Sequence, residues 1–482
     1  MFINRQAELQ LLEERYVSNQ AELFVLYGRR RVGKTELLAQ FCREKRKRHI
    51  FFVADLDVEP VLRAAFSMAV NTELLGPEAA SAVYPSWQDI FLLLAHHAQT
   101  ERLVVVLDEF TYLVDAHPPL ASTLQRIWDS NLAHSKLMLV LCGSYVGMME
   151  EAVLGYNAPL YGRRTAQYLL EPLDFHNARD FFPAYDLADQ VRAFAVFGGV
   201  PAYVRVVSAS QPLLANVGRQ VLTRGTFLYD EVRFLLQQEL REPRNYFAVL
   251  EAIASGRTRL NEIKQATGLD GVTSYLNTLQ GLRLVERVVP VTEDKPHKSR
   301  RGLYRLRDQF FRFWFRFVHP NRTLLERGGA QVALDALVTP QLDSFTAPVF
   351  EEICRQFLWR LGLAGELPFL PLRIGGWWRA NEEIDGVAVG QDSALLVECK
   401  WTSRPIGVDI LRNLERKAGL VGKEIGSRRL YFGLCARSGF TPQVEEEAAQ
   451  RDDLFLFDLP RIVEATSNHR ERKGRKREKG NG

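Results

Sequence analysis

A phosphate-loop motif constrains the fold of this chain more than any other feature. Residues 23–35 read LFVLYGRRRVGKT, in which a short apolar strand runs into a loop of the form GxxxxGK[ST]. The overlapping TELLAQFCREK has helical periodicity, so the motif stands between a strand and a helix as it should. A glycine-rich turn that binds nothing is the alternative, which this context disfavours. The segment predicts an α/β fold with a parallel sheet and a phosphate-binding loop.

The residues of this loop have expected roles in binding ATP with Mg²⁺. Glycines at both ends let the loop curl so that backbone N–H groups face phosphate, and the helix N-terminus adds partial positive charge. Lys34 is expected to reach the β- and γ-phosphates, and the Thr35 hydroxyl to face the metal ion. The arginines either contact phosphate or remain solvated. The expected nucleotide-binding residues of the loop are Gly28, Arg29, Arg30, Arg31, Val32, Gly33, Lys34, Thr35 and Glu36.

Two further apolar strands end in polar residues. RLVVVLDEF places Asp108 and Glu109 after a buried strand, which we expect beside the strand of the phosphate loop. Asp108 is predicted to hold the metal ion through water, and Glu109 to orient or deprotonate the attacking water; a structural acid is the alternative. KLMLVLCGS ends in Ser144, which we predict to sense the γ-phosphate, although a serine that caps the next helix would look the same.

Taken together, these motifs resemble the archaeal-type ATPase family within the AAA+/STAND group of P-loop NTPases. The resemblance spans roughly residues 1–205 and includes FINRQAELQLL at the start and GGVPAYV at the end. It implies a set of residues near the nucleotide base, namely Arg5, Glu8, Gly199 and Pro201. It also suggests Arg163 or Arg164 as an arginine that acts on the γ-phosphate or between subunits of a homo-oligomer. Simple pairing of either arginine with an acid is the alternative.

The middle of the chain predicts two helical regions. Residues 186–240 are expected to form a small lid, and residues 241–320 follow the order of a winged helix-turn-helix, three helices and then two strands. DNA binding and internal packing both remain open for it. The candidate DNA contacts are Thr273, Ser274, Asn277 and Gln280 on the third helix and Lys295, Lys298, Arg300 and Arg301 in the wing. FFRFWFRFVHP, residues 310–320, is expected to pack in a core rather than to stack on single-stranded nucleic acid.

The C-terminal part carries a second candidate site. After a connector at 321–340 comes the helix FTAPVFEEICRQFLWRLG, and GGWWRANEEIDGVAVGQDSALLVECKW then predicts two strands joined at GQDS. Asp385 and Glu398, on neighbouring strands, could share a hard divalent cation, which would activate a water and stabilise charge on a scissile phosphate. Lys400 points to the same face as Glu398 and could position that water, while Glu351 could complete the site from the helix.

This element order resembles the PD-(D/E)xK nuclease core, a restriction-endonuclease-like domain that accompanies archaeal-type ATPases. The helix LRNLERKAG and the strand RRLYFGLCARSGF continue the pattern to about residue 465. The catalytic candidates are therefore Asp385, Glu398 and Lys400 here and Lys34 and Glu109 in the ATPase domain. The alternative for the C-terminal site is a salt bridge of Lys400 with Asp385 or Glu398 on an inactive nuclease fold.

Bulk properties limit the remaining possibilities. A chain of 482 residues is too long for one core, and its expected parts are an ATPase domain (1–185), lid (186–240), winged helix (241–320), connector (321–340), nuclease-like domain (341–465) and basic disordered tail (466–482). The net charge is only +4, so the chain as a whole is not a polycation. Its charge is uneven, however, because the C-terminal tail is mostly basic, and this tail either contacts phosphate or solubilises the chain. No apolar run approaches a membrane span and the start does not read as a secretory signal.

The cysteines indicate a reducing compartment, and we expect the cytoplasm. Cys42, Cys142, Cys354, Cys399 and Cys435 include no CxxC pair, so we expect neither a zinc site nor a disulfide framework. The sequence as a whole predicts a P-loop ATPase that regulates a metal-dependent nuclease-like domain acting on DNA. The alternative is an ATP-dependent switch or DNA-binding regulator whose nuclease-like domain is non-catalytic.

Overall fold

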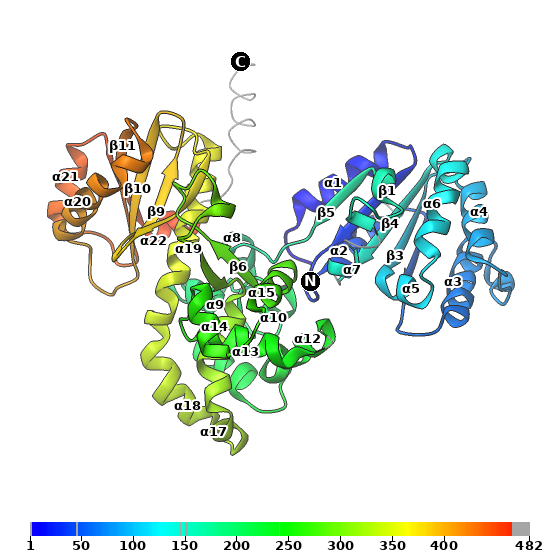
Figure 1. Ribbon diagram of the computed structural model, residues 1–482, viewed down its shortest axis with the longest axis horizontal. Coiled ribbons are helices and arrows are strands. Elements are labelled where there is room, and N and C mark those ends of the chain that lie inside the picture. Colours follow the sequence, from blue (N-terminus) through cyan, green and yellow to red (C-terminus); the bar gives the residue numbers. More distant parts are fainter. Residues whose placement is uncertain (1, 45–46, 145, 150–152, 241, 465–482) are drawn as a thin grey trace. The chain divides into compact units, whose positions relative to one another are not determined.

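The chain forms two compact units in the computed structural model, which describes residues 2–44, 47–144, 146–149, 153–240 and 242–464 (Figure 1). The first unit comprises Met1–Pro172, Val200–Ala202 and Gly281–Arg283, and the second Leu173–Gly199, Tyr203–Gln280 and Leu284–Gly482. The predicted basic tail, 466–482, lies outside the described residues. Among the helices of the described residues, none has the length and apolarity needed to cross a membrane.

The first unit is built on a five-stranded parallel sheet. Its strands are β1 (Glu22–Tyr27), β2 (His49–Val53), β3 (Leu103–Asp108), β4 (Leu137–Gly143) and β5 (Ala166–Leu169), in the order β2-β3-β4-β1-β5. Both faces of the sheet are covered by helices, as parallel sheets require. One core includes side chains of α3 (Glu59–Leu74), α4 (Trp87–His97) and α6 (Leu120–Ser130), and the other those of α1 (Gln6–Val17) and α2 (Lys34–Arg43).

The strand order corrects one expectation from the sequence. β4 lies between β1 and β3, so the strand that ends in Asp108 is not the neighbour of the phosphate-loop strand. The strand that leads to Ser144 is that neighbour, as predicted. An apolar run shows that a strand is buried on both faces but does not specify the strands beside it, so the sequence could not distinguish the two arrangements.

The N-terminal part of the second unit is helical, as predicted. It contains α9 (Leu187–Phe197), α11 (Leu213–Val217) and α12 (Phe227–Glu239), followed by α13 (Pro243–Ala254), α14 (Leu260–Thr267) and α15 (Val272–Gly281). Two antiparallel strands come next, β6 (Val285–Val288) and β7 (Leu303–Leu306). Three helices and a two-stranded ribbon therefore follow one another in the predicted order, while the roles of these parts as lid and winged helix stay predictions.

The aromatic run at 310–320 lies in the core, as expected. It forms α16 (Gln309–Phe313) and a π-helical turn (Trp314–Val318), and its six aromatic rings are at most 4% exposed. The Trp314 indole donates a hydrogen bond of 2.7 Å to the backbone oxygen of Tyr229. The buried rings cannot stack on single-stranded nucleic acid. The predicted connector, 321–340, is itself mostly helical and leads into α19 (Leu342–Ala364).

The C-terminal part of the second unit is a mixed five-stranded sheet between two helical layers. Its strands are β8 (Arg373–Arg379), β9 (Glu382–Val389), β10 (Ser393–Lys400), β11 (Arg429–Ala436) and β12 (Leu454–Asp458), in the order β12-β11-β10-β9-β8. The β8–β9 and β9–β10 pairs are antiparallel, whereas β10–β11 and β11–β12 are parallel. α19 and α22 (Leu459–Glu464) cover one face, and α20 (Val408–Ile425) and α21 (Pro442–Ala449) the other (Figure 1).

The sequence underestimated the number of strands in this sheet. The stretch predicted as two strands contains three, because β8 turns at 380–381 into β9, with Ala380 in the left-handed region at φ 53°. β12 was not predicted either. β8 contains two consecutive glycines, and its pairing with β9 is irregular between Gly375 and Trp377. Glycine weakens a strand and often marks a bulge, so the strand pattern of β8 is hidden in the sequence.

Asp343, in the first turn of α19, joins three parts of the second unit. Its Oδ1 accepts hydrogen bonds from Arg192 Nε (2.9 Å) and Trp401 Nε1 (3.1 Å), and its Oδ2 accepts one from Arg437 (2.8 Å). Burial raises the pKa of this carboxyl, but the hydrogen bonds from Arg192, Arg437 and Trp401 outweigh burial and lower the pKa to about 2. The ionised form of Asp343 therefore stabilises the folded unit.

We expect Asp343→Asn to destabilise the second unit by about 1 kcal/mol at pH 7, a modest effect because solvent screens this half-exposed carboxylate. The folded-state pKa lies below the value of about 3.9 in an unfolded chain. The contribution is therefore complete above about pH 4 and is lost as pH falls toward 2. Thermal unfolding at pH 7 and pH 3 should show the larger difference from wild type at pH 7. Asp452→Asn, at an exposed ion pair with Arg429, is the control, and equal midpoints for Asp343→Asn and wild type at pH 7 would contradict this role.

Candidate nucleotide-binding and acidic sites

The phosphate loop, residues 28–33, connects β1 to α2 as predicted. Gly28 has a φ of 152°, and a Cβ built there would lie 2.4 Å from the backbone oxygen of Leu170, so only glycine fits. The buried Lys34 ammonium donates to the backbone oxygens of Gly28 (2.8 Å) and Arg29 (3.1 Å) and thus spans the loop from its far end. The Lys34 amine, which was predicted to contact phosphate, is therefore hydrogen-bonded to the start of its own loop.

Thr35, in the first turn of α2, meets Asp108 at the end of β3 although β1 and β3 are not neighbours. The Thr35 hydroxyl donates to Asp108 Oδ2 over 2.5 Å, and the Asp108 carboxylate is buried. The backbone N–H of Glu109 donates to the other oxygen, Oδ1, over 2.9 Å and so fixes the carboxylate. Hydroxyl and carboxylate oxygens are the ligand types that Mg²⁺ prefers, so these residues fit the predicted metal ion.

Glu109 and Ser144 also come together. The Ser144 hydroxyl lies 2.6 Å from each oxygen of the Glu109 carboxylate, to which it donates. Glu109 itself stands before α5 (Phe110–Ala116) in the left-handed region, with φ 51°. Such a conformation is unfavourable for a non-glycine residue and concentrates at functional sites. The sequence predicted a role for each residue but not the hydrogen bond between them.

Arg5, the residue that precedes α1, contacts the phosphate loop. Its guanidinium donates to the backbone oxygens of Val32 (3.2 Å) and Glu171 (2.7 Å) and to the Glu8 carboxylate (2.9 Å). Pro201 lies against the same loop, since its Cγ is 3.8 Å from the place that a Cβ on Gly33 would take. Two of the four residues implied by the family resemblance, Arg5 and Pro201, therefore lie beside the phosphate loop, and the contact of all four with a base stays a prediction.

The arginines and the glutamate of the motif differ in their surroundings. Arg29 is buried, Arg30 donates to the hydroxyl of Tyr112, and Arg31 takes a left-handed φ of 73°. Glu36 is exposed in the first turn of α2. Their contacts with nucleotide stay predictions.

Arg163 pairs with an acid, the alternative that the sequence left open. Its Nη2 and Nε lie 2.9 and 3.1 Å from the two carboxylate oxygens of Asp129. Arg164 donates to the backbone oxygen of Tyr161 over 3.1 Å. Within one chain, therefore, the guanidinium of Arg163 is held by Asp129.

The predicted C-terminal acids and lysine also converge. The side chains of Asp385 on β9 and Glu398 on β10 are only 9% and 7% exposed. Lys400 Nζ lies 2.7 Å from Glu398 Oε1 and 4.0 Å from Asp385 Oδ2. The backbone N–H of Cys399 donates to Asp385 Oδ2 over 2.8 Å. Two buried carboxylates on adjacent strands thus share one ammonium group.

The electrostatics of this cluster fit a divalent cation. Burial, and then the nearby acidic groups of Cys399, Glu398 and Glu351, raise the pKa of the Asp385 carboxyl to about 8. Burial lowers the pKa of Lys400, but its hydrogen bond to Glu398 and the charges around it raise that pKa overall. Carboxylates crowded in this way keep their charge more easily beside a cation, and their oxygens are the ligands that hard cations prefer.

Glu351 lies at the margin of the cluster. Burial raises the pKa of its carboxyl, and its Oε2 is 3.8 Å from the guanidinium of Arg355, one turn along α19. Arg355 also donates to the backbone oxygen of Asp385 over 2.7 Å. The helix thus brings an acid and a cation to the strand that bears Asp385.

Lys417 is a member of this cluster that sequence reasoning missed. It lies on α20, is buried, and donates to Glu398 Oε2 over 3.2 Å. The available signal was a lysine on the apolar side of an amphipathic helix, between Leu414 and Val421. Lys400 and Lys417 both donate to Glu398, so the salt bridge of Lys400 with Glu398, predicted as an alternative to the metal site, is present.

A polar groove of about 640 Å³ separates α15 from the β6–β7 loop. It is lined by basic and amide groups, among them Arg259, Arg287, His297, Arg300, Asn277 and Gln280. None of the described residues that line it is acidic. Two of the predicted helix contacts and one of the predicted wing contacts therefore face a common groove.

Arg301 does not suit its predicted phosphate contact. Its guanidinium is 2.7 Å from Glu293 Oε1 and 3.1 Å from Glu424, a residue of α20. Two carboxylates thus neutralise it and hold it against the C-terminal sheet domain. The sequence showed only a basic residue in a basic loop.

Comparison with known proteins gives two family matches. The profile of the family described as an ATPase domain predominantly from Archaea matches residues 2–207, and that of a family of archaeal and bacterial proteins of unknown function matches residues 314–416. An uncharacterized protein of Methanocaldococcus jannaschii is 32% identical over 468 residues, which cover 95% of this chain and 99% of that protein. An uncharacterized ATP-binding protein of the same organism is 52% identical over 46 residues, which cover 10% of this chain and 78% of that protein.

The solved structures that this chain resembles are more distant. The Walker-type ATPase of Pyrococcus abyssi is 21% identical, covers 65% of this chain and 96% of its own, and has a TM-score of 0.49. The ORC2 protein of Aeropyrum pernix, solved as ADPNP and ADP complexes, is 14% identical, covers 69% of this chain and 94% of its own, and has a TM-score of 0.40.

Proposed function

Because this chain belongs to the family of ATPases predominantly from Archaea, we propose that it couples ATP binding and hydrolysis to a metal-dependent, nuclease-like site that acts on DNA. The observation that carries the second half of the proposal is the buried pair Asp385 and Glu398 beside Lys400. ATP would change the state of the first unit, and that change would regulate the acidic site of the second.

The residues of the first unit support hydrolysis of ATP. Lys34 would bind the β- and γ-phosphates, and Thr35 and Asp108 would hold Mg²⁺, which neutralises phosphate charge when bound. Glu109 would orient or deprotonate the attacking water. Ser144, through its hydrogen bond, positions the Glu109 carboxylate and would face the γ-phosphate.

The residues of the second site support cleavage of a phosphodiester. Asp385 and Glu398, with Glu351 at the margin, would hold a divalent cation, which supplies activation of water and stabilises charge on the scissile phosphate. Lys400 would position that water, and Lys417 on α20 also donates to the Glu398 carboxylate. The succession of α19, three antiparallel strands, α20 and a parallel strand supports a PD-(D/E)xK fold.

The groove beside α15 supports contact with DNA through a winged helix. Its arginines suit phosphate, and Asn277 and Gln280 suit base edges. The tail at 466–482 would add non-specific attraction to phosphate. We also retain a homo-oligomer as a proposal. The five free cysteines support the expectation of a reducing compartment, the cytoplasm.

The second candidate function is an ATP-dependent switch whose nuclease-like domain is non-catalytic. The hydrogen bonds of Lys400 and Lys417 to Glu398 favour it, because a buried carboxylate satisfied by two lysines can serve structure alone. The two functions differ only in the chemistry at Asp385, Glu398 and Lys400.

Metal removal separates the two functions. Purified protein is incubated with supercoiled plasmid and with single-stranded DNA, with Mg²⁺ or Mn²⁺, with and without ATP. We expect cleavage that stops in EDTA, and a response to ATP that Lys34→Ala loses together with ATP hydrolysis.

Two outcomes would overturn parts of the proposal. Cleavage that persists in EDTA, or that is equal in wild type and Glu398→Ala, would come from a contaminant and refute the nuclease. ATP hydrolysis that persists in Lys34→Ala would refute the assignment of the phosphate loop.

A further inference from the structure

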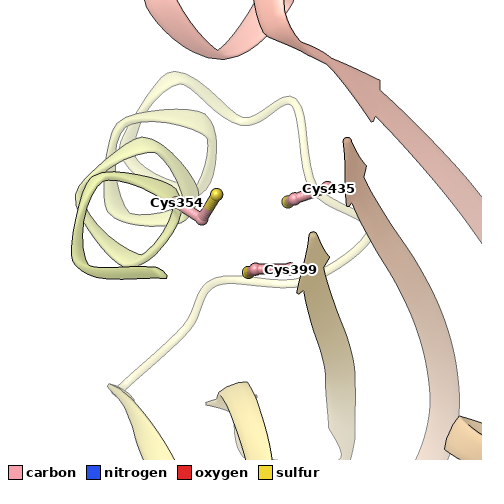
Figure 2. A group of neighbouring side chains, drawn as sticks. All are labelled: Cys354, Cys399 and Cys435. Carbon is pink, nitrogen blue, oxygen red and sulfur yellow. The ribbon is translucent and has the colours of Figure 1, made fainter. Parts of the chain in front are cut away.

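Three cysteines that are far apart in the sequence meet inside the C-terminal sheet domain. Cys354 on α19, Cys399 on β10 and Cys435 on β11 place their sulfur atoms within 4.8 Å of one another (Figure 2). Their residues are 1%, 6% and 0% exposed. Across the described parts of the chain, this is the single group of three or more His, Cys, Asp or Glu residues whose ligand atoms all lie within 4.8 Å of one another. The spacing in the sequence predicted neither a zinc site nor a disulfide framework, and it did not predict that these three cysteines meet.

The packing of α19 against β10 and β11 brings these three thiols together. Cys399 and Cys435 are register partners on the parallel strands β10 and β11, so their side chains leave the sheet on the same face. α19 packs on that face and supplies Cys354, and the three sulfurs lie in the layer between helix and strands (Figure 2). Each ligand comes from a different element, so the geometry of the triangle is fixed by the packing of the core.

We propose that this triangle binds one soft, thiophilic metal ion, and that Cu(I) is the ion that suits it best. Thiolates select soft ions. A metal–sulfur distance of about 2.3 Å in a planar trigonal site sets the sulfurs about 4 Å apart, so binding requires shifts of less than about 1 Å. Structural zinc almost always takes four ligands, whereas no fourth His, Cys, Asp or Glu of the described residues joins this group.

Binding would replace the thiol protons. Three thiols and one Cu(I) ion give a trithiolate complex and three released protons, with no change of oxidation state. Arg355, which follows Cys354 on α19 and is only 14% exposed, is within electrostatic range of Cys399 and offsets part of the negative charge. A disulfide is the poorer alternative, because it would join two sulfurs and leave the third buried thiol without a role.

The test is Cu(I) binding by the full chain under reducing conditions. Titration against a colorimetric Cu(I) chelator should show one tightly bound equivalent in wild type. Cys354→Ser, Cys399→Ser and Cys435→Ser should each weaken binding at least 100-fold. Cys42→Ser and Cys142→Ser are matched controls, since these cysteines are also buried but lie outside the triangle, and both should bind like wild type.

Two further measurements keep the test decisive if a serine variant folds poorly. X-ray absorption of the wild-type complex should show three sulfur ligands at about 2.3 Å. Cu(I) binding should also raise the temperature at which the wild-type second unit unfolds. Unchanged binding in the triple serine variant, nitrogen or oxygen ligands, a competing chelator that shows tighter Zn(II) binding, or a disulfide between two of the cysteines in freshly reduced protein would each overturn the proposal.

Discussion

Changing Glu109 to glutamine is expected to slow ATP hydrolysis by about 100- to 10,000-fold, the usual contribution of a general base, while ATP binding remains. Glutamine keeps the size of the side chain and can still accept the hydrogen bond of the Ser144 hydroxyl, 2.6 Å away. It cannot take a proton from water. The phosphate loop, Thr35 and Asp108 are untouched, so the nucleotide site keeps its shape.

Single-turnover hydrolysis and equilibrium binding of a fluorescent ATP analogue measure the two effects separately. Glu101→Gln, which removes an exposed carboxylate paired with Arg48 elsewhere in the same unit, is the control and should hydrolyse ATP like wild type. If Glu109→Gln hydrolyses ATP at more than a tenth of the wild-type rate, Glu109 is a structural acid. If it loses ATP binding as well, the residue holds the site together rather than activating water.

Changing Glu398 to glutamine is expected to reduce DNA cleavage roughly 1000-fold, the equivalent of about 4 kcal/mol of lost transition-state stabilisation. Glutamine preserves the volume of the side chain but removes the charge and one of the two oxygens that could bind a cation. It also removes the anionic partner of Lys417 Nζ, 3.2 Å away, and leaves Lys400 Nζ only the Asp385 carboxylate at 4.0 Å.

Initial rates of plasmid nicking at saturating Mg²⁺ measure this effect, and ATP hydrolysis by the same preparation reports on the first unit. Glu445→Gln changes an exposed glutamate on α21 of the same domain and should cleave DNA like wild type. Equal rates for Glu398→Gln and wild type would mean that Glu398 serves only the ion pair. In that case the second candidate function, a switch without nuclease chemistry, would be favoured.

The phosphate-binding half could be predicted because its signals are local. The glycines, the lysine and the threonine of the loop are consecutive, and each acid follows directly on an apolar strand. The structure brings these residues together, with the Thr35 hydroxyl hydrogen-bonded to Asp108 and the Ser144 hydroxyl hydrogen-bonded to Glu109, although neither hydrogen bond was predicted. What remained hidden was the insertion of β4 between β1 and β3, because the order of parallel strands is set by long connections and not by the composition of the strands.

The second site could be predicted only in part. Glu398 and Lys400 share a face by simple alternation, and Asp385 on the preceding strand was identified from the order of elements. Lys417 was missed, because it approaches Glu398 from a helix whose amphipathic pattern resembles that of any surface helix. The cysteine triangle was missed because spacing rules detect ligands that are near in sequence, whereas these three come from a helix and two strands across 82 residues.

The pleat of β10 has a consequence for how this domain must fold. Leu395, Val397 and Cys399 belong to the apolar layer under α19, while Ala394 and Leu396 face α20 and Glu398 meets Lys417 on that same side. A slip of this strand by a single residue would drive a carboxylate and an ammonium into the apolar layer and carry the thiol to the polar side. Misregistered pairings of β10 are therefore heavily penalised, so the few residues that make the site chemically unusual also help to select its one correct alignment.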